Sequence, residues 1–355
     1  QHLSYYSLRG VRKFDYPPSF TYHEPWWDDY RLLGDYIGRM SLAGSSGEQL
    51  NEILVLQPNT TAWMYFSRKV RTRIDSIQYR FKSFVWQLER EHVEYDLGSE
   101  QVIKTLGSVQ GEKLKVGNRA YGLVVIPASM ENLDKTTYQL MVEFLAAGGR
   151  IISFASDIPY LDGAPSELIN ELLHRNPDQC FFVKEISDPL FQNAIAQDDF
   201  SITESTSGYG ELYHQRRILD DGQLIMLVNS SEDQSATATI EAKGKSVISL
   251  DLISGEISQV VVKSRGKTIS FQADLPPVGS AIYFISHSNS SLPFIKTKNG
   301  EGGLVASTKQ LEISADQDNI LVLNYLDLKS GDLELKDSYF MDALLALFDS
   351  HGLEM

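Results

Sequence analysis

The spacing of apolar residues changes near Gln223 in this chain of 355 residues. Before that point, short apolar runs alternate with longer segments in which apolar residues recur every three or four positions, as in strands and helices that follow one another. After it, apolar residues recur at every second position in short segments separated by turn residues, as in antiparallel strands. The two patterns together constrain the chain to an α/β part followed by a β part.

The first pattern predicts a parallel sheet with helices, because strand–helix–strand connections are almost always right-handed crossovers. The expected strands cover residues 53–56, 93–96, 121–127 and 150–155, and the expected helices between them cover residues 68–92 and 136–147. Gly148 and Gly149 are expected to end the later helix in the left-handed conformation.

Another helix is expected over residues 26–46. Apolar side chains recur there at three- and four-residue steps, which predicts one apolar face. That face would be formed by Trp26, Trp27, Tyr30, Leu33, Ile37 and Met40.

The second pattern predicts an antiparallel β-sandwich. Its expected strands cover residues 224–229, 236–242, 247–251, 256–262, 268–273 and 280–285. A polar linker over 286–303 leads to a last segment, 304–355, with two expected strands (311–313 and 320–325) and a helix at 339–348. About 50 residues can hardly bury a core of their own, so this module is expected to be truncated, and both ends of the chain are expected to be cut.

The composition excludes some classes of function. Acidic residues number 47 and basic residues 32, so the formal net charge is −15, which repels phosphate backbones and argues against nucleic acid as a partner. A neutral substrate would be indifferent to that charge. No apolar run approaches the ~20 residues that a membrane-spanning helix needs. The one cysteine, Cys180, cannot form an intrachain disulfide and is expected to be a small buried hydrophobe.

Familiar cofactor and catalytic motifs are missing from the sequence, including glycine-rich nucleotide loops and zinc-binding helices. One weak phosphate-binding signal follows the first expected strand, at residues 57–63, where two threonine hydroxyls and backbone amides could face a ligand. A purely structural turn from strand to helix is the favoured interpretation. A flavin-binding protein is therefore the last of the functions considered.

The opening segment carries the most chemical side chains. Aromatic, basic, acidic and histidine residues lie together in a stretch interrupted by prolines, and such loops often hold binding groups. Aromatic rings beside hydrogen-bonding groups suit a sugar, which offers apolar faces and a rim of hydroxyls. A structural loop that caps a core is the alternative. The candidate substrate-binding residues are His2, Arg12, Lys13, Asp15, Tyr16, His23, Glu24 and Trp26.

Three segments here resemble a known family: His2-Leu3-Ser4-Tyr5-Tyr6-Ser7-Leu8-Arg9-Gly10, then Arg12-Lys13-x-Asp15-x-Pro17-Pro18, then His23-Glu24-Pro25-Trp26-Trp27. They are similar to large multidomain bacterial glycoside hydrolases related to the α-L-rhamnosidases of glycoside hydrolase family 106, which often carry a family 2-like sugar-binding module. The resemblance implies four domains: the end of a (β/α)8 catalytic barrel (1–50), a flavodoxin- or amidotransferase-like parallel α/β domain (51–185), a small antiparallel β-sandwich (186–290) and a partial jelly-roll-like sugar-binding module (304–355).

In a barrel, the loops after the strands form the active-site face. The resemblance therefore implies that residues 9–25 lie over that face, with Arg12 and Lys13 donating to sugar hydroxyls and Asp15 and Glu24 accepting from them. Tyr16 or Trp26 would stack on a sugar ring. His2 would contact substrate or make a structural hydrogen bond.

Hydrolysis of a glycosidic bond generally needs two carboxyl groups. In the resembling enzymes they come mainly from earlier barrel strands, which this chain does not contain, so its catalytic residues stay unknown. We expect a C-terminal portion of a glycosidase that acts on plant or microbial polysaccharide and is inactive alone. The alternative is a noncatalytic carbohydrate-binding or scaffold assembly. The resemblance further implies no cofactor in this portion, calcium as an option in the full-length enzyme, and a secreted or periplasmic location; the oligomeric state is left open.

Overall fold

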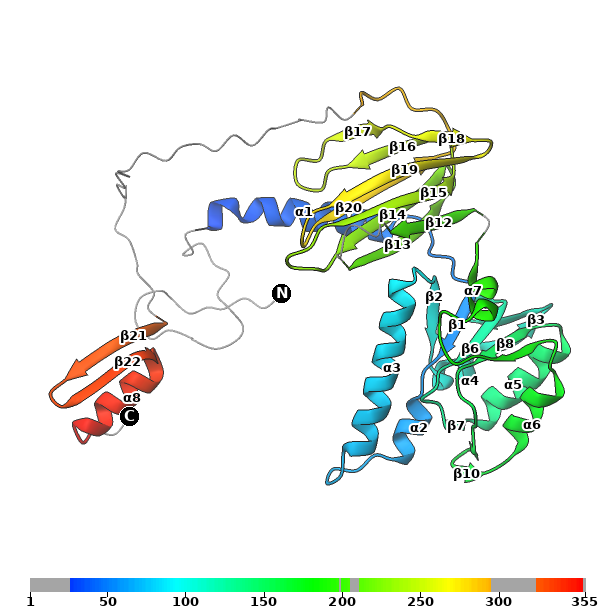
Figure 1. Ribbon diagram of the computed structural model, residues 1–355, viewed down its shortest axis with the longest axis horizontal. Helices are drawn as coiled ribbons and strands as arrows, with labels where there is room; N and C mark the ends of the chain where they lie inside the picture. The colour runs from blue at the N-terminus through cyan, green and yellow to red at the C-terminus, as the bar shows by residue number, and fades with distance from the viewer. Residues whose placement is uncertain (1–25, 198, 205–210, 295–323, 354–355) are drawn as a thin grey trace. The chain divides into compact units, whose positions relative to one another are not determined.

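The computed structural model describes residues 26–197, 199–204, 211–294 and 324–353. Contacts divide the chain into two units, residues 1–296 and residues 297–355. The first unit holds a five-stranded parallel sheet with helices, and two antiparallel sheets of four and five strands (Figure 1). The prediction of a mixed fold with one parallel sheet and antiparallel sheets is confirmed.

Five strands form the parallel sheet, in the order β11-β8-β6-β1-β2. They are β1 (Ile53–Leu56), β2 (Tyr95–Gly98), β6 (Leu123–Ile126), β8 (Arg150–Ser153) and β11 (Cys180–Phe182). All residues of β1 and β6 are buried, because helices cover both faces of the sheet and leave no position for a polar side chain. The first four strands confirm the prediction, with β2 displaced by two residues. Cys180 is buried in the core as expected, and desolvation raises its pKa to about 11.

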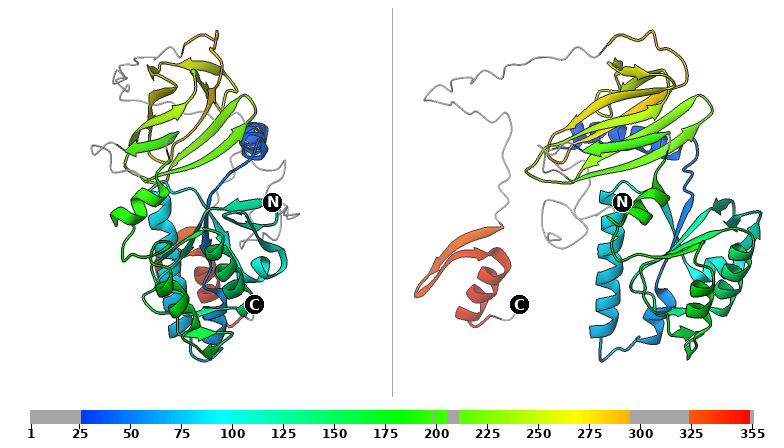
Figure 2. Two further views of the ribbon diagram at one scale, coloured as in Figure 1. Left: turned by 90° about the vertical axis from the view of Figure 1, so that its right-hand side faces the viewer. Right: turned by 45° about the vertical axis from the view of Figure 1, so that its right-hand side comes forward.

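Six helices accompany this sheet: α2 (Asn59–Met64), α3 (Thr72–Arg90), α4 (Glu100–Leu106), α5 (Lys135–Ala146), α6 (Leu168–Arg175) and α7 (Pro189–Ile195). Apolar residues of α4, α5 and α6 pack on one face and those of α3 and α7 on the other, so the sheet is a middle layer (Figure 2). Gly148 ends α5 at φ +101°, and Gly149 N donates to Phe144 O at 2.8 Å, which confirms the predicted left-handed helix end.

Two small sheets border the α/β part. The first pairs β3, β4 and β5 (Gly107–Gln110, Lys113–Val116 and Arg119–Tyr121), and the second pairs β7, β9 and β10 (Asn132–Leu133, Tyr160–Leu161 and Ala164–Pro165).

The β part of the first unit is a sandwich of two antiparallel sheets, ordered β12-β15-β19-β18 and β13-β14-β20-β16-β17. Inward-facing apolar residues of both sheets form one core, as alternating strands require. The strands are β12 (Phe200–Glu204), β13 (Leu212–Leu219), β14 (Gly222–Asn229), β15 (Ala236–Lys243), β16 (Ser246–Leu250), β17 (Ile257–Val260), β18 (Lys263–Arg265), β19 (Thr268–Leu275) and β20 (Ser280–Ser286). The six predicted strands are present, whereas β12, β13 and β18 were not expected.

Helix α1 (Tyr30–Ser45) follows a short 3-10 helix, η1 (Trp27–Asp29), and lies against the outer face of the sandwich. The predicted helix is therefore confirmed, but of its predicted apolar face only Met40 contacts the sandwich. Tyr36, Met40 and Ala43 make the contact, whereas Leu33 and Ile37 are 47% and 51% exposed. Apolar positions extend around the helix on both sides of Met40, and only part of that surface is covered.

The second unit contains a β-hairpin followed by a helix: β21 (Tyr325–Ser330), β22 (Leu333–Tyr339) and α8 (Phe340–Ser350). The helix expected at 339–348 is confirmed. The strand expected at 311–313 and most of that at 320–325 lie outside the described residues.

Candidate functional site

The structure describes one of the eight predicted substrate-binding residues. Trp26 precedes the 3-10 helix η1, has 39% of its surface exposed, and its ring centroid lies 5.7 Å from that of Tyr30. Trp27 stacks on the same tyrosine at 5.6 Å. The other seven lie outside the described residues: His2, Arg12, Lys13, Asp15, Tyr16, His23 and Glu24.

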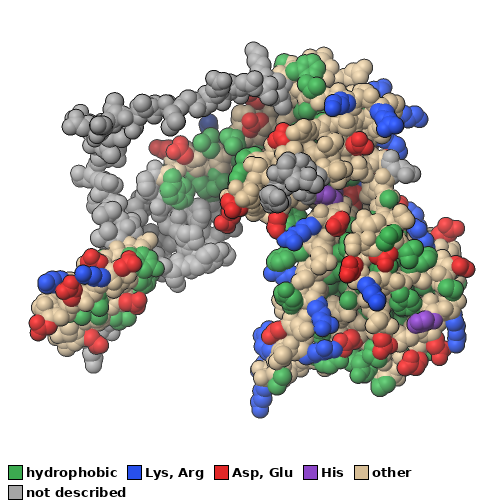
Figure 3. Space-filling view, viewed as in Figure 1, with side chains coloured by type: hydrophobic (Ala, Val, Ile, Leu, Met, Phe, Trp, Pro, Cys, Tyr) green, Lys and Arg blue, Asp and Glu red, His purple; other side chains and the backbone are tan. Residues whose placement is uncertain are grey.

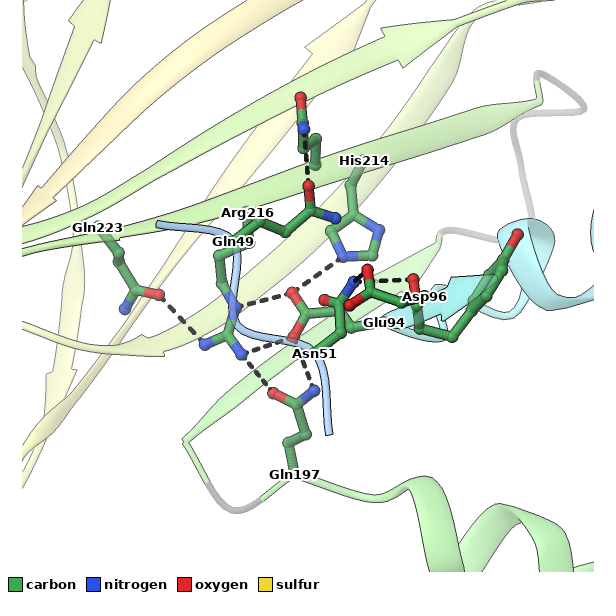
Figure 4. A network of polar contacts seen from close by, with 10 residues as sticks. Gln49, Asn51, Glu94, Asp96, Gln197, His214, Arg216 and Gln223 are labelled. Carbon is green, nitrogen blue, oxygen red and sulfur yellow. Dashed lines mark hydrogen bonds and ion pairs between the residues drawn. The ribbon is translucent and has the colours of Figure 1, made fainter. Parts of the chain in front are cut away.

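Within the described residues, a buried network of polar and charged side chains joins the α/β part to the sandwich (Figure 4). Glu94 comes just before β2, and Arg216 lies on β13. Arg216 Nε donates to Glu94 Oε1 at 2.8 Å and Nη2 donates to Oε2 at 2.6 Å, a bidentate pair. Gln197 Nε2 donates to the same carboxylate at 2.8 Å and its amide oxygen accepts from Arg216 at 2.6 Å. The Glu94 carboxylate and the Arg216 guanidinium are therefore each held by an ion pair and by further hydrogen bonds.

Two further side chains enclose the pair. His214 Nε2 lies 3.5 Å from Glu94 Oε1, close enough for an electrostatic contact but without hydrogen-bond geometry. The ring of Phe200, on β12, lies 4.4 Å from the Arg216 guanidinium carbon and 5.6 Å from the His214 ring centre. The side chains of Glu94, Arg216 and His214 are only 7%, 10% and 4% exposed. We call Glu94, Gln197, His214 and Arg216 the junction network.

The junction network keeps Glu94 ionised. Burial by itself opposes ionisation, but the contact with His214, the hydrogen bonds and charge of Arg216 and the hydrogen bond from Gln197 outweigh it, so the pKa of Glu94 falls to about 2. A carboxylate held this way cannot serve as a general acid near neutral pH. Glu94 therefore has a structural role, because its bonds to Arg216 hold the α/β part against the sandwich.

The lowered pKa of Glu94 predicts a loss of stability in acid. The group is lowered from 4.5 to about 2 in the folded protein, so its contribution is complete above pH 4.5 and disappears as the pH falls toward 2. The difference corresponds to roughly 3 kcal/mol. Urea denaturation from pH 6 to pH 2.5 measures the free energy of unfolding of the unchanged chain and of Glu94→Gln. The difference between these two free energies should become smaller as the pH falls. A difference in free energy that stays constant over this pH range would contradict the lowered pKa of Glu94.

A second contact holds the same two parts together. Residues 46–49 lie along the free edge of β13, where Glu48 and Ile218 exchange both backbone hydrogen bonds at 2.9 and 2.8 Å. Arg217 donates to the backbone oxygens of Ser46 and Gly47. This contact covers an edge strand that would otherwise expose unpaired backbone groups.

The carboxyl end of the parallel sheet is the other place where such a fold binds ligands, at the point between β1 and β6 where successive crossovers diverge. Here that point is filled by the protein's own side chains. Thr61 Oγ1 accepts from the backbone nitrogens of Glu131 and Asn132 at 3.0 and 3.1 Å, and Thr60 donates to the buried carboxyl of Glu100, whose pKa is raised by burial. Both hydroxyls considered for phosphate are thus used internally, which confirms the structural interpretation of residues 57–63.

The junction network was not predicted from the sequence. One signal was present: His214 and Arg216 stand two residues apart beside a tight turn, so in a strand they share one face. Their partner Glu94 lies about 120 residues earlier and has no sequence link to them.

Two features are absent from the described residues: a metal-ligating cluster and a membrane-spanning helix. No group of three or more His, Cys, Asp or Glu side chains among them could hold a metal. None of the helices in these ranges combines the length and apolar character needed to cross a bilayer.

Comparison with known proteins gives structural likeness only. No protein-family model matches the chain, and no curated protein matches its sequence. The rhamnosidase from Novosphingobium sp. PP1Y superposes with a TM-score of 0.58 at 15% identity, over 80% of this chain and 27% of that chain. A β-galactosidase from Bacillus circulans sp. alkalophilus gives 0.46 at 11% identity, over 74% and 46% of the two chains. The α-L-fucosidase isoenzyme 2 from Paenibacillus thiaminolyticus gives 0.42 at 10%, over 74% and 53%.

The chain thus has a fold like that of part of a glycoside hydrolase. More particularly, that fold is shared with a rhamnosidase, of whose length the chain spans about a quarter. At this level of identity the likeness concerns the fold alone.

Proposed function

We propose that this chain is the C-terminal portion of an α-L-rhamnosidase-like glycoside hydrolase that acts on plant or microbial polysaccharide. The observation that carries the proposal is the superposition of 80% of the chain on 27% of a rhamnosidase. The opening segment supports it independently, because its aromatic, basic and acidic residues suit a sugar.

The described domains act in this proposal as a rigid support. The junction network and the Glu48–Ile218 contact hold the α/β part against the sandwich, and the usual ligand position of the parallel sheet is filled by Thr60 and Thr61. The catalytic work falls to residues outside these domains. His2, Arg12, Lys13, Asp15, Tyr16, His23, Glu24 and Trp26 are proposed to line one wall of the substrate site.

The remaining parts of the proposal concern setting and organisation. Residues 1–50 would close a catalytic barrel and residues 304–355 would belong to a sugar-binding module. The enzyme would be secreted or periplasmic. Calcium would be an option in the full-length enzyme.

An activity assay tests the proposal. The 355-residue chain and the complete reading frame of its gene are each incubated with aryl α-L-rhamnosides and other aryl glycosides. We expect turnover from the complete protein and none above the uncatalysed rate from the chain alone, because two carboxyl groups must flank the bond. In the complete protein, Asp15→Asn and Glu24→Gln should each raise KM several-fold, the size expected for losing a hydrogen bond to a sugar hydroxyl.

Two outcomes would contradict the proposal. Turnover by the 355-residue chain that disappears in Asp15→Asn or Glu24→Gln would place the catalytic carboxyl groups within it. A complete protein that binds polysaccharide but cleaves none of the aryl glycosides would favour the noncatalytic binding assembly instead.

A further inference from the structure

Five basic residues gather at one end of the sandwich of this acidic chain. Lys243 and Lys245 flank one turn, and Lys263, Arg265 and Lys267 surround another, whereas residues 242–250 and 257–273 contain no Asp or Glu. Figure 3 shows Lys and Arg side chains gathered over this end of the sandwich, at the upper right. We call these five residues the basic patch. Its charge is opposite in sign to the net charge of −15.

The fold brings the two turns together. Lys243, the last residue of β15, stands in register with Thr268 at the start of β19, and Arg265 of β18 pairs with Thr268 from the other side. Gly244 N donates to Lys267 O at 3.3 Å, which links the turns directly. The patch is therefore a fixed feature of three adjacent strands.

Within the described ranges, most of these cations lack an anionic partner. Lys243 forms an ion pair with Asp199 at 3.6 Å. The other four make no ion pair within 4.0 Å among the residues that the structure describes, and residues 263–267 are all exposed. Lysine and arginine on an edge strand discourage aggregation, which accounts for Lys263 and Arg265. That role does not account for Lys245 and Lys267, which lie in turns outside the strand.

Beside β18 the surface forms a hollow of about 530 Å³, lined by Glu241, Lys263, Ser264, Arg265, Thr268 and Ser270. Two cations can pair with carboxylates, while three hydroxyls and one carboxylate can exchange hydrogen bonds with sugar hydroxyls. This mixture fits a partner that carries both carboxylates and many hydroxyls. Single-stranded DNA fits less well, because its repeating unit carries no free hydroxyl to meet these side chains.

We propose that the hollow and the basic patch bind a carboxylate-bearing polysaccharide, through residues other than those of the proposed substrate wall. The choice of a carbohydrate as the partner rests on the proposed function. The basic patch and the hollow are observed in the structure and do not depend on that function. The surface would hold the enzyme on an acidic polymer while another region cleaves it.

Binding of the whole 355-residue chain to polygalacturonate tests the proposal, by titration calorimetry in 20 mM and 500 mM salt. We expect binding at low salt that weakens strongly at high salt, because exposed charges are screened. Lys263→Ala/Arg265→Ala/Lys267→Ala should weaken it about tenfold, as expected when three exposed ion pairs are lost. The matched control is Arg68→Ala/Lys69→Ala/Arg80→Ala, which also removes three exposed cations and should change the affinity less than about twofold.

A second comparison is independent of any variant. Methyl-esterified polygalacturonate keeps the hydroxyls and loses the charges, so its binding should be much weaker. Equal binding of the esterified polymer, equal loss in both triple variants, or equally tight binding of single-stranded DNA would each overturn the proposal. If the complete protein hydrolyses rhamnosides but the 355-residue chain does not bind polygalacturonate, this inference is refuted and the proposed function is not.

Discussion

Replacing Glu94 by glutamine is expected to lower the free energy of unfolding by about 3 to 5 kcal/mol, the range for breaking a buried ion pair from one side. Arg216 is only 10% exposed and gives two of its hydrogen bonds to Glu94. The neutral amide leaves that guanidinium charge without its anion, and the amide nitrogen faces donors instead of accepting from them. Urea denaturation at pH 7, followed by circular dichroism, measures the change.

The matched control is Glu171→Gln, which breaks an exposed pair with Arg175 at 2.7 Å on α6. Its cost should stay below about 1 kcal/mol, because solvent already screens both charges. The double variant Glu94→Gln/Arg216→Met removes both buried charges and should recover part of the stability lost in Glu94→Gln. If the two single glutamine variants were equally stable, the junction network would not be the connection we describe.

The parallel sheet could be predicted from the sequence because its strands obey one simple rule. β1 and β6 are covered on both faces, so each appears in the sequence as an unbroken apolar run. Most sandwich strands obey the alternating rule equally well; in β15, every second residue is buried and those between are exposed or half-buried. Where a strand faces only apolar neighbours and solvent, the pattern of its own residues suffices.

β13 shows why the rest could not be predicted. His214 and Arg216 occupy the face of β13 that also carries Leu212 of the sandwich core, where the alternating pattern requires apolar residues. They are tolerated because Glu94 supplies a compensating charge from a segment about 120 residues away. The information that makes this strand stable is therefore absent from its local sequence.

The candidate site residues likewise include some that the sequence predicts and others that it does not. Trp26 is described, but its seven companions in the predicted substrate wall lie outside the described residues, so that wall stays a prediction. The junction network depends on the register between two distant segments, which no single motif encodes. For α1, the period of the apolar residues predicted the helix but not the buried side, because apolar residues cover more of the helix than its neighbours do.

Replacing Gly47 by alanine is expected to lower the free energy of unfolding by about 3 kcal/mol. Gly47 has φ +59°, a conformation that costs a residue with a side chain about 1 to 2 kcal/mol. A Cβ atom there would stand 2.2 Å from Ile218 O, so the backbones must separate. Separation breaks the two hydrogen bonds between Glu48 and Ile218, each worth about 1 kcal/mol.

Gly38→Ala in α1 is the control, because its added methyl group meets no atom within 4 Å and should stabilise the helix by about 0.5 to 1 kcal/mol. The two alanine variants should therefore move stability in opposite directions in the same denaturation experiment. Hydrogen exchange separates local from general damage: in Gly47→Ala the amides of Glu48 and Ile218 should exchange faster, while those of β1 and β6 keep their protection relative to global unfolding. Unchanged exchange at Glu48 and Ile218 would show that residues 46–49 do not hold the edge of β13.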